Sequence, residues 1–390
     1  MDQFQFFTRL CLVGLLLVAG LAVTSAYTAA QVGPLSFVIE LDPAQGQLPE
    51  GIAVAEDAIY VGMAPTSQVF RINLDDGQAS LYGQLPQAPP GEGFMVGMAL
   101  DANGNLYVNL ASFTPQVRTG IYRVPAGGGS AALFASDEAM LFPNDLVFDD
   151  RGNLFVTDTF AATVFKVSSD GSVSPWVQSP LLQGDRNACP PAGLDFDIGA
   201  NGLAFDGRGS LFVLNTDHGT VVRIPVMRDG TAGTPEVFVG PNCTILKGAD
   251  GLTIDSRGNL YAAVNALNML VRVGRNKRVT VMDSGKLLDF PASLDFGVST
   301  TDDSTLYITN FALGSAQAGG QPNPGVLKKE VGIKGRTLPT VYTVQADDTL
   351  WEIAQQFYGN GTRWMEIAQA NGIDVNNPRF LRVGEWLVIP

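Results

Sequence analysis

Six segments of the chain place one residue just before an apolar run, and four of these six residues carry a side-chain oxygen. The six positions are Glu50, Val96, Asn144, Asn201, Asp250 and Ala292. The first five lead into runs such as Gly-Leu-Thr-Ile after Asp250, whereas the last, Ala292-Ser-Leu-Asp-Phe, is degenerate. Carboxylate and amide oxygens are ligands that Ca²⁺ prefers. If the fold brings them together, Glu50, Asn144, Asn201 and Asp250 are predicted to bind one calcium ion.

The spacing of these positions indicates which elements hold them. Successive positions are 46, 48, 57, 49 and 42 residues apart, by subtraction of their residue numbers, close to the roughly 40 to 50 residues of a β-propeller blade. Each unit has a polar glycine turn, such as Asp149-Asp-Arg-Gly-Asn, and then β-rich segments such as Leu211–Leu214, which argues against helical repeats. We therefore predict an all-β six-bladed β-propeller over residues 35–332. The last repeat lacks an outer strand, which Phe37–Leu41 is expected to supply.

In a propeller the innermost strands line a central channel, so residues at one register meet around its axis. The alternative is that these Asn and Asp side chains only cap strands and turns. A site for a metal that prefers nitrogen or sulfur ligands is disfavoured, because the chain has one His, His218, and only two Cys beyond residue 30.

These residues resemble the gluconolactonase and regucalcin family, the SMP-30-like six-bladed propellers. That family binds a catalytic calcium through a Glu in the first blade, an Asn of an Asn-Asp pair, an Asn of Asn-Gly and an Asp of Asp-Gly. Glu50, Asn144, Asn201 and Asp250 match these in turn. A gluconolactonase has an Arg two positions before the Asn-Asp pair, whereas this chain has Phe142, which makes a polar sugar lactone a less secure substrate.

The resemblance implies a calcium-dependent hydrolase of the lactonase or esterase type, acting on a small lactone or ester. In this chemistry calcium acts as a Lewis acid on the substrate oxygen. Asp250 is the candidate general base or nucleophile, and Asp145 could instead orient water or serve as the base. A Ser-His-Asp triad is disfavoured, because it would have to use His218 and no nucleophile-elbow motif is present. The competing hypothesis is a non-catalytic, calcium-stabilised binding module, which Phe142 favours.

Composition and the first residues bear on location. A net charge of −14 over 390 residues opposes binding to nucleic acid or anionic membranes. Residues 1–30 read as a secretory signal, with Arg9 before an apolar run from Leu10 to Val23; an uncleaved anchor is the alternative. We expect a secreted protein, periplasmic or associated with the cell wall. Export permits disulfides, and we predict a Cys189–Cys243 bridge over the mouth of the site, the alternative being two unpaired thiols.

A separate small domain follows a linker at residues 333–339 and covers residues 340–390. Its pattern is strand, helix, helix, strand, with a capping box at Thr349-Leu-Trp-Glu. The segment from Tyr342 to Pro390 resembles a lysin motif (LysM), a family that binds N-acetylglucosamine-containing glycans such as peptidoglycan. The resemblance implies a groove formed by Asp348, Thr349, Leu350, Asn371, Gly372 and Ile373. Three Trp residues of this segment, including Trp351 and Trp386, are expected in its core rather than on a ligand platform.

Overall fold

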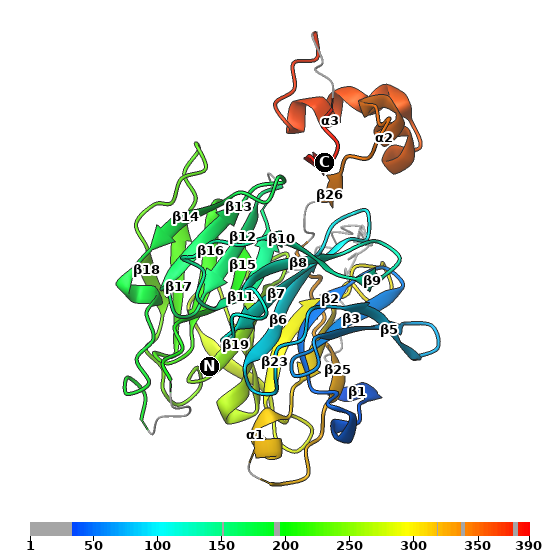
Figure 1. Ribbon diagram of the computed structural model, residues 1–390. Coiled ribbons are helices and arrows are strands. Elements are labelled where there is room, and N and C mark those ends of the chain that lie inside the picture. The colour runs from blue at the N-terminus through cyan, green and yellow to red at the C-terminus, as the bar shows by residue number, and fades with distance from the viewer. Residues whose placement is uncertain (1–32, 150–151, 191–195, 318, 337–339, 377–380) are drawn as a thin grey trace, which may run out of the picture.

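The computed structural model describes residues 33–149, 152–190, 196–317, 319–336, 340–376 and 381–390. Within these ranges the chain folds into six antiparallel sheets arranged around a channel, followed by a small two-stranded domain (Figure 1). This confirms the predicted six-bladed propeller with a C-terminal βααβ domain. The predicted signal segment, residues 1–30, lies outside the described residues. No helix among the described residues is long and apolar enough to cross a membrane.

Each blade runs outward from an inner strand. Blade 1 comprises β2 Pro49–Val54, β3 Ala58–Met63, β4 Gln68–Asn73 and β5 Ala79–Gln84. Blade 2 comprises β6 Gly93–Leu100, β7 Leu106–Ser112, β8 Gly120–Val124 and β10 Ala132–Ala135. Blade 3 comprises β11 Pro143–Phe148, β12 Leu154–Asp158, β13 Thr163–Val167 and β14 Val173–Gln178. A short strand, β9 Gly129–Ser130, adds to β5 in parallel.

Blade 4 comprises β15 Ala200–Phe205, β16 Ser210–Asn215, β17 Thr220–Pro225 and β18 Glu236–Val239. Blade 5 comprises β19 Ala249–Ile254, β20 Leu260–Val264, β21 Met269–Val273 and β22 Val279–Ser284. Blade 6 comprises β23 Pro291–Phe296, β24 Thr305–Asn310, β25 Gly325–Glu330 and β1 Ser36–Glu40. Connecting helices are α1 Leu313–Gln317, η1 Pro43–Gln45, η2 Pro180–Leu182 and η3 Asn265–Leu267.

The predicted ring closure is confirmed, one residue upstream of the expected bounds. Strand β1 pairs antiparallel with β25, with Ser36 opposite Lys328. The Lys329 ammonium, which is almost fully buried, donates to the Gly33 carbonyl at 3.1 Å and the Asp283 carboxylate at 3.0 Å. The N-terminal strand is therefore tied both to the last blade and to its neighbour.

The core lies between blades. All six residues of β3 are buried, because both faces of a second strand pack against neighbouring sheets, whereas outer strands such as β5 are half exposed. Inner strands begin at one end of the channel and end at a hairpin turn at the other. We call these the upstream end and the turn end.

The C-terminal domain consists of β26 Thr340–Thr343, α2 Leu350–Tyr358, η4 Gly361–Arg363, α3 Trp364–Ala370 and β27 Trp386–Ile389. The predicted capping box is present, since the Thr349 hydroxyl accepts from the Glu352 amide while the Glu352 carboxylate accepts from the Thr349 amide. Leu350, Ile353 and Ile367 pack with Leu387 in the core of this domain.

The domain is docked on the turn end of blades 2 and 3. The Trp386 indole donates to the Tyr107 hydroxyl at 3.1 Å and packs edge-on against Phe148. Thr343 donates its hydroxyl to the buried Asp101 carboxylate at 2.6 Å. The prediction that the Trp residues form the core of their own domain is wrong for two of them: Trp386 is buried against the propeller and Trp351 is 52% exposed.

Candidate metal centre

Every inner strand carries an irregularity at the predicted register. In all six inner pairs the ladder shifts across the position in question, for example between Pro143 and Leu146 and between Ala249 and Leu252. A bulge leaves residues out of the ladder and redirects their side chains. The repeated bulge therefore turns Glu50, Asn144, Asn201 and Asp250 toward the channel axis.

The residue after the register position explains why the sequence repeats glycine there. A Cβ on Gly51 would lie 2.4 Å from the Val96 carbonyl oxygen, and one on Gly202 would lie 2.3 Å from the Asp250 carbonyl oxygen. These glycines let the inner strands of adjacent blades approach closely. Blade 3 has Asp145 at this position and blade 6 has Ser293.

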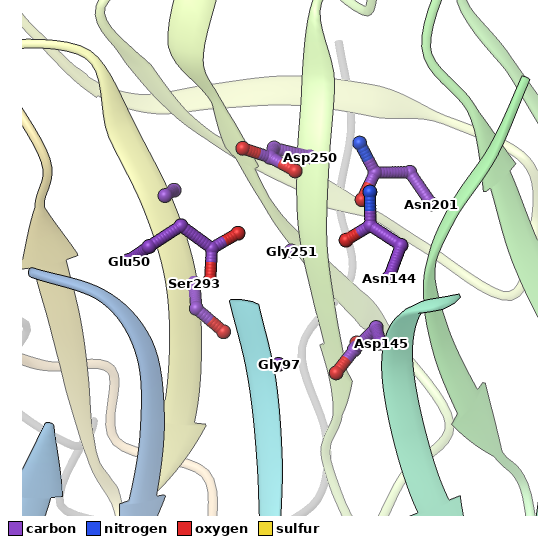
Figure 2. A pocket seen from close by; sticks show the side chains of 9 residues that line it. Glu50, Gly97, Asn144, Asp145, Asn201, Asp250, Gly251 and Ser293 are labelled. Carbon is purple, nitrogen blue, oxygen red and sulfur yellow. The ribbon is translucent and has the colours of Figure 1, made fainter. Parts of the chain in front are cut away.

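The four predicted ligands line one small cavity. It is bounded by Glu50, Gly97, Asn144, Asp145, Asn201, Asp250, Gly251, Ala292 and Ser293. The space open to the centre of a water-sized sphere is about 10 Å³, close to the minimum for one bound water. Figure 2 shows the Glu50 carboxylate facing the side-chain oxygens of Asn144 and Asn201 across this space, with Asp250 between them. The cavity therefore has the size of a single ion or water.

Threonines fix the orientation of both amides. The Asn144 side-chain nitrogen donates to the Thr159 hydroxyl at 3.0 Å, and that hydroxyl donates to the Ala200 carbonyl at 2.8 Å. Asn201 donates in the same way to Thr216, at 3.0 Å. A hydroxyl that donates to a carbonyl must accept from the amide nitrogen. The amide oxygens are thereby held toward the cavity.

Sequence reasoning missed these supporting residues, although a signal existed. Thr159, Thr216 and Asn265 each lie 15 positions after the side chain they contact. Asn265 donates to the Asp250 carboxylate at 3.0 Å. The constant offset reflects one geometry: the inner strand, its turn and the second strand return the chain to the upstream end beside the register residue.

We expect Thr216→Val to weaken calcium binding by about 10- to 100-fold, the usual effect of losing a group that orients a metal ligand. The Asn201 amide would lose the acceptor that fixes its direction. Isothermal titration with Ca²⁺ measures the change. Thr220→Val, on the next strand, is the matched control; an equal loss in that variant would contradict the orienting role.

The environment of the Glu50 and Asp250 carboxyl groups favours binding of a cation. Glu50 Oε2 is buried with no hydrogen-bond partner. Burial, together with the nearby Asp250 and Asp145 carboxylates, raises the Glu50 pKa well above its ordinary value. Burial likewise raises the Asp250 pKa to about 7, against the lowering effect of hydrogen bonds from Asn265 and Asn201. A buried carboxyl oxygen without a hydrogen-bond partner among the described residues, in a cavity lined by oxygens, fits a hard cation such as Ca²⁺, which would favour the ionised form.

The carboxylates alone do not make a typical metal cluster. No group of three or more His, Cys, Asp or Glu side chains in the described ranges is arranged to hold a metal ion. A calcium ion at this position would therefore depend on the two amide oxygens, and on water or substrate for its remaining ligands.

Asp145 differs from Asp250 in its partners. One of its oxygens accepts from the Leu146 amide at 2.9 Å and the other from the Leu203 amide of the next blade at 3.3 Å. Burial raises its pKa to about 7. The side chain thus joins the inner strands of blades 3 and 4 at the wall of the cavity.

Comparison with known families identifies both parts of the chain. The model of the SMP-30/gluconolactonase/LRE-like region matches residues 48–312, which is more than half of the 390 residues. The chain belongs to the SMP-30/gluconolactonase/LRE-like family. The LysM domain model matches residues 342–390. The gluconolactonase-like propeller is therefore followed by a LysM domain.

Two curated proteins resemble parts of the chain. A lactonase, drp35, of Staphylococcus saprophyticus is 27% identical over 213 residues, covering 50% of this chain and 56% of that protein. The uncharacterized protein YqbP of Bacillus subtilis is 44% identical over 55 residues, covering 13% of this chain and 25% of that protein. The chain thus spans about half the length of the lactonase and a quarter of YqbP.

Solved structures share the propeller fold. A gluconolactonase from Xanthomonas campestris superposes with a TM-score of 0.56 at 19% identity, covering 79% of this chain and 93% of that one. A calcium-binding regucalcin from Agrobacterium tumefaciens gives a TM-score of 0.55 at 17% identity, covering 75% and 92%.

The predicted disulfide of this gluconolactonase-like chain is confirmed. Cys189 and Cys243 are bonded, with their Cα atoms 5.2 Å apart. The bond joins the segment before β15 to the segment before β19, so it lies at the upstream end. His218, the single histidine, lies in the turn between β16 and β17.

The predicted glycan-binding residues of the LysM domain have mixed environments. Leu350 and Ile373 are buried in one core cluster, which brings their two loops together. The Asn371 amide is occupied internally: it donates to the Val388 carbonyl and accepts from the Val388 amide, both at 2.8 Å. Asp347, in the loop before α2, has a φ of 68°, a region that favours glycine.

Proposed function

We propose that the protein is an exported, calcium-dependent hydrolase of lactones or esters, held at the cell wall by its LysM domain. The observation that carries the proposal is the ring of four oxygen ligands, from four different blades, around a cavity of about one water. Membership of the gluconolactonase family and the similarity to a lactonase support the reaction class.

In this proposal Glu50, Asn144, Asn201 and Asp250 hold the calcium, which when bound polarises the substrate carbonyl and stabilises the charge that develops on its oxygen. Asp250 is the candidate general base, because its carboxylate lies in the cavity wall, where the substrate carbonyl would meet the calcium, and Asn265 holds one of its oxygens at 3.0 Å. Asp145 has both oxygens engaged with backbone amides. We therefore assign it the positioning of the inner strands.

A turnover panel of aliphatic and sugar lactones, with and without a calcium chelator, tests the proposal. We expect hydrolysis of at least one lactone and its loss on chelation, with recovery when Ca²⁺ is restored. Activity that survives chelation would overturn the calcium mechanism. The second candidate is a non-catalytic binding module, favoured by the apolar Phe142 two positions before the register residue Asn144; absence of turnover on every ester would support it.

The LysM domain and the disulfide suggest an extracellular or cell-wall protein. We expect the full chain to sediment with insoluble peptidoglycan, and a chain ending at Gly332 to remain in the supernatant. Asp348→Ala in the full chain is a finer test, because Asp348 accepts from Tyr342 and Gln345 to shape the loop before α2. Equal retention of the shortened chain would contradict wall binding through this domain.

A further inference from the structure

An aromatic surface borders the metal cavity at the upstream end. We define the aromatic rim as Phe113, Phe142 and Phe160, which lie after β7, before β11 and after β12. Their ring centroids are 6.0 Å apart for Phe113 and Phe142, 5.1 Å for Phe142 and Phe160, and 6.4 Å for Phe113 and Phe160. Phe94 and Phe196 extend the rim at either side.

The rim is exposed in a way that a core cluster is not. Phe113 is 51% exposed and Phe160 is 37% exposed, whereas Phe142 is buried beneath them. A contiguous patch of exposed aromatic rings is typical of a binding surface.

The rim is linked to the metal cavity through two register residues: Ala292 lines the cavity, and Val96 directly precedes Gly97, which also lines it. Phe142 packs against Val96, the register residue of blade 2 that carries no oxygen, together with Ala111 and Phe94. Phe94 also contacts the apolar cluster over Ala292, the other register residue without an oxygen. The six register residues at the upstream end of the channel are therefore of two kinds. Four blades contribute side-chain oxygens, and the other two contribute apolar residues that pack under aromatic rings.

The rim is also rigid. Asp158, fully buried, accepts from the Leu141 and Phe142 amides with one oxygen and from the Phe160 and Ala161 amides with the other, at 2.8 to 3.1 Å. Phe113 donates its amide to the Glu92 carbonyl at 2.8 Å. The rings are held in place before any ligand arrives, which lowers the entropic cost of binding.

We propose that the aromatic rim binds the apolar substituent of the substrate, so that the preferred substrates are lactones or esters with an alkyl chain or aryl group rather than polar sugar lactones. This rests on the proposed function. A substituent lying across Phe113 and Phe160 could extend from a carbonyl placed at the metal cavity, because Phe142 packs on Val96, the residue before Gly97 of the cavity wall. Because the rim is linked to the cavity, the proposed occupant of the rim is a small-molecule substrate that also reaches the cavity.

A homologous series of lactones with lengthening alkyl side chains tests the substrate class. We expect kcat/KM to rise about fourfold per methylene until the rim is covered, as burial of each CH₂ would give. In Phe113→Ala/Phe160→Ala the ratio of kcat/KM for the longest to the shortest lactone should fall about tenfold or more. Leu81→Ala, an equally exposed residue on the outer strand of blade 1, is the matched control and should keep the wild-type ratio.

A second measurement separates this inference from the proposed function. Isothermal titration with non-hydrolysable alkyl lactams reports rim binding without turnover. Chain-length-dependent lactam binding that is lost in the double variant supports the rim even where no lactone is hydrolysed. Calcium-dependent hydrolysis with no chain-length dependence overturns the rim and leaves the hydrolase standing. Lactam binding unaffected by the double variant, with loss of binding to phosphatidylcholine vesicles, would overturn the rim as a substrate site and identify a membrane contact.

Discussion

Replacing Asp250 by Asn should reduce the turnover of any accepted lactone by about 10²- to 10⁴-fold, the range expected when a general base or a charge-stabilising group is lost. Asp250 has its carboxylate in the cavity wall and one oxygen fixed by Asn265 at 3.0 Å. The amide has a similar shape but cannot take the proton. Initial rates at saturating Ca²⁺, on protein shown to be folded by circular dichroism, measure the loss.

Asp145→Asn is the informative comparison, because this neighbouring aspartate lies in the same wall and has the same raised pKa of about 7. Since its oxygens are engaged by the Leu146 and Leu203 amides, we expect mainly a loss of thermal stability, with activity per folded molecule within about tenfold of wild type. Undiminished turnover in Asp250→Asn would contradict its role as the base, and a larger loss of turnover in Asp145→Asn would assign that role to Asp145.

Calcium should stabilise the protein more at pH 8 than at pH 5. Burial raises the pKa of Asp145, Asp250 and Asp295 from the ordinary 3.8 to about 7. Between about pH 4 and pH 7 the folded, metal-free protein therefore holds protons that the unfolded chain has lost, so its stability falls as pH rises through this window. A bound cation favours the ionised carboxylates and offsets this loss.

Thermal unfolding at both pH values, with chelator or with Ca²⁺, measures the effect. With Ca²⁺ fixed at about 100 times the Kd at pH 8, we expect Tm to rise by about 3 to 5 °C at pH 8, and by less at pH 5. Asp295→Asn is the control, since Asp295 lies in the channel but not in the cavity wall: it should flatten the pH dependence in chelator yet keep the calcium gain. A calcium gain equal at both pH values would contradict the coupling.

The register of the site could be predicted because it repeats. Glu50 and Asp250 stand out through their place before an apolar run, and a propeller converts equal register into spatial proximity. Thr159 and Thr216 directly follow β12 and β16. Only their constant offset of 15 residues marks them in the sequence, because their role depends on a bulge that no local pattern specifies. The contact of Trp386 with Tyr107 joins residues 279 positions apart, beyond any periodicity.

The LysM domain lies on the turn end of the propeller (Figure 1), where Asp101 and Tyr107 fix it. The candidate metal cavity and the aromatic rim are formed by residues at the upstream end. A molecule attached to a glycan layer through this domain would keep one orientation, with its cavity directed toward the surrounding medium. Freely diffusing compounds would then reach the site without crossing the polysaccharide, whereas bonds within the polymer itself would stay out of reach.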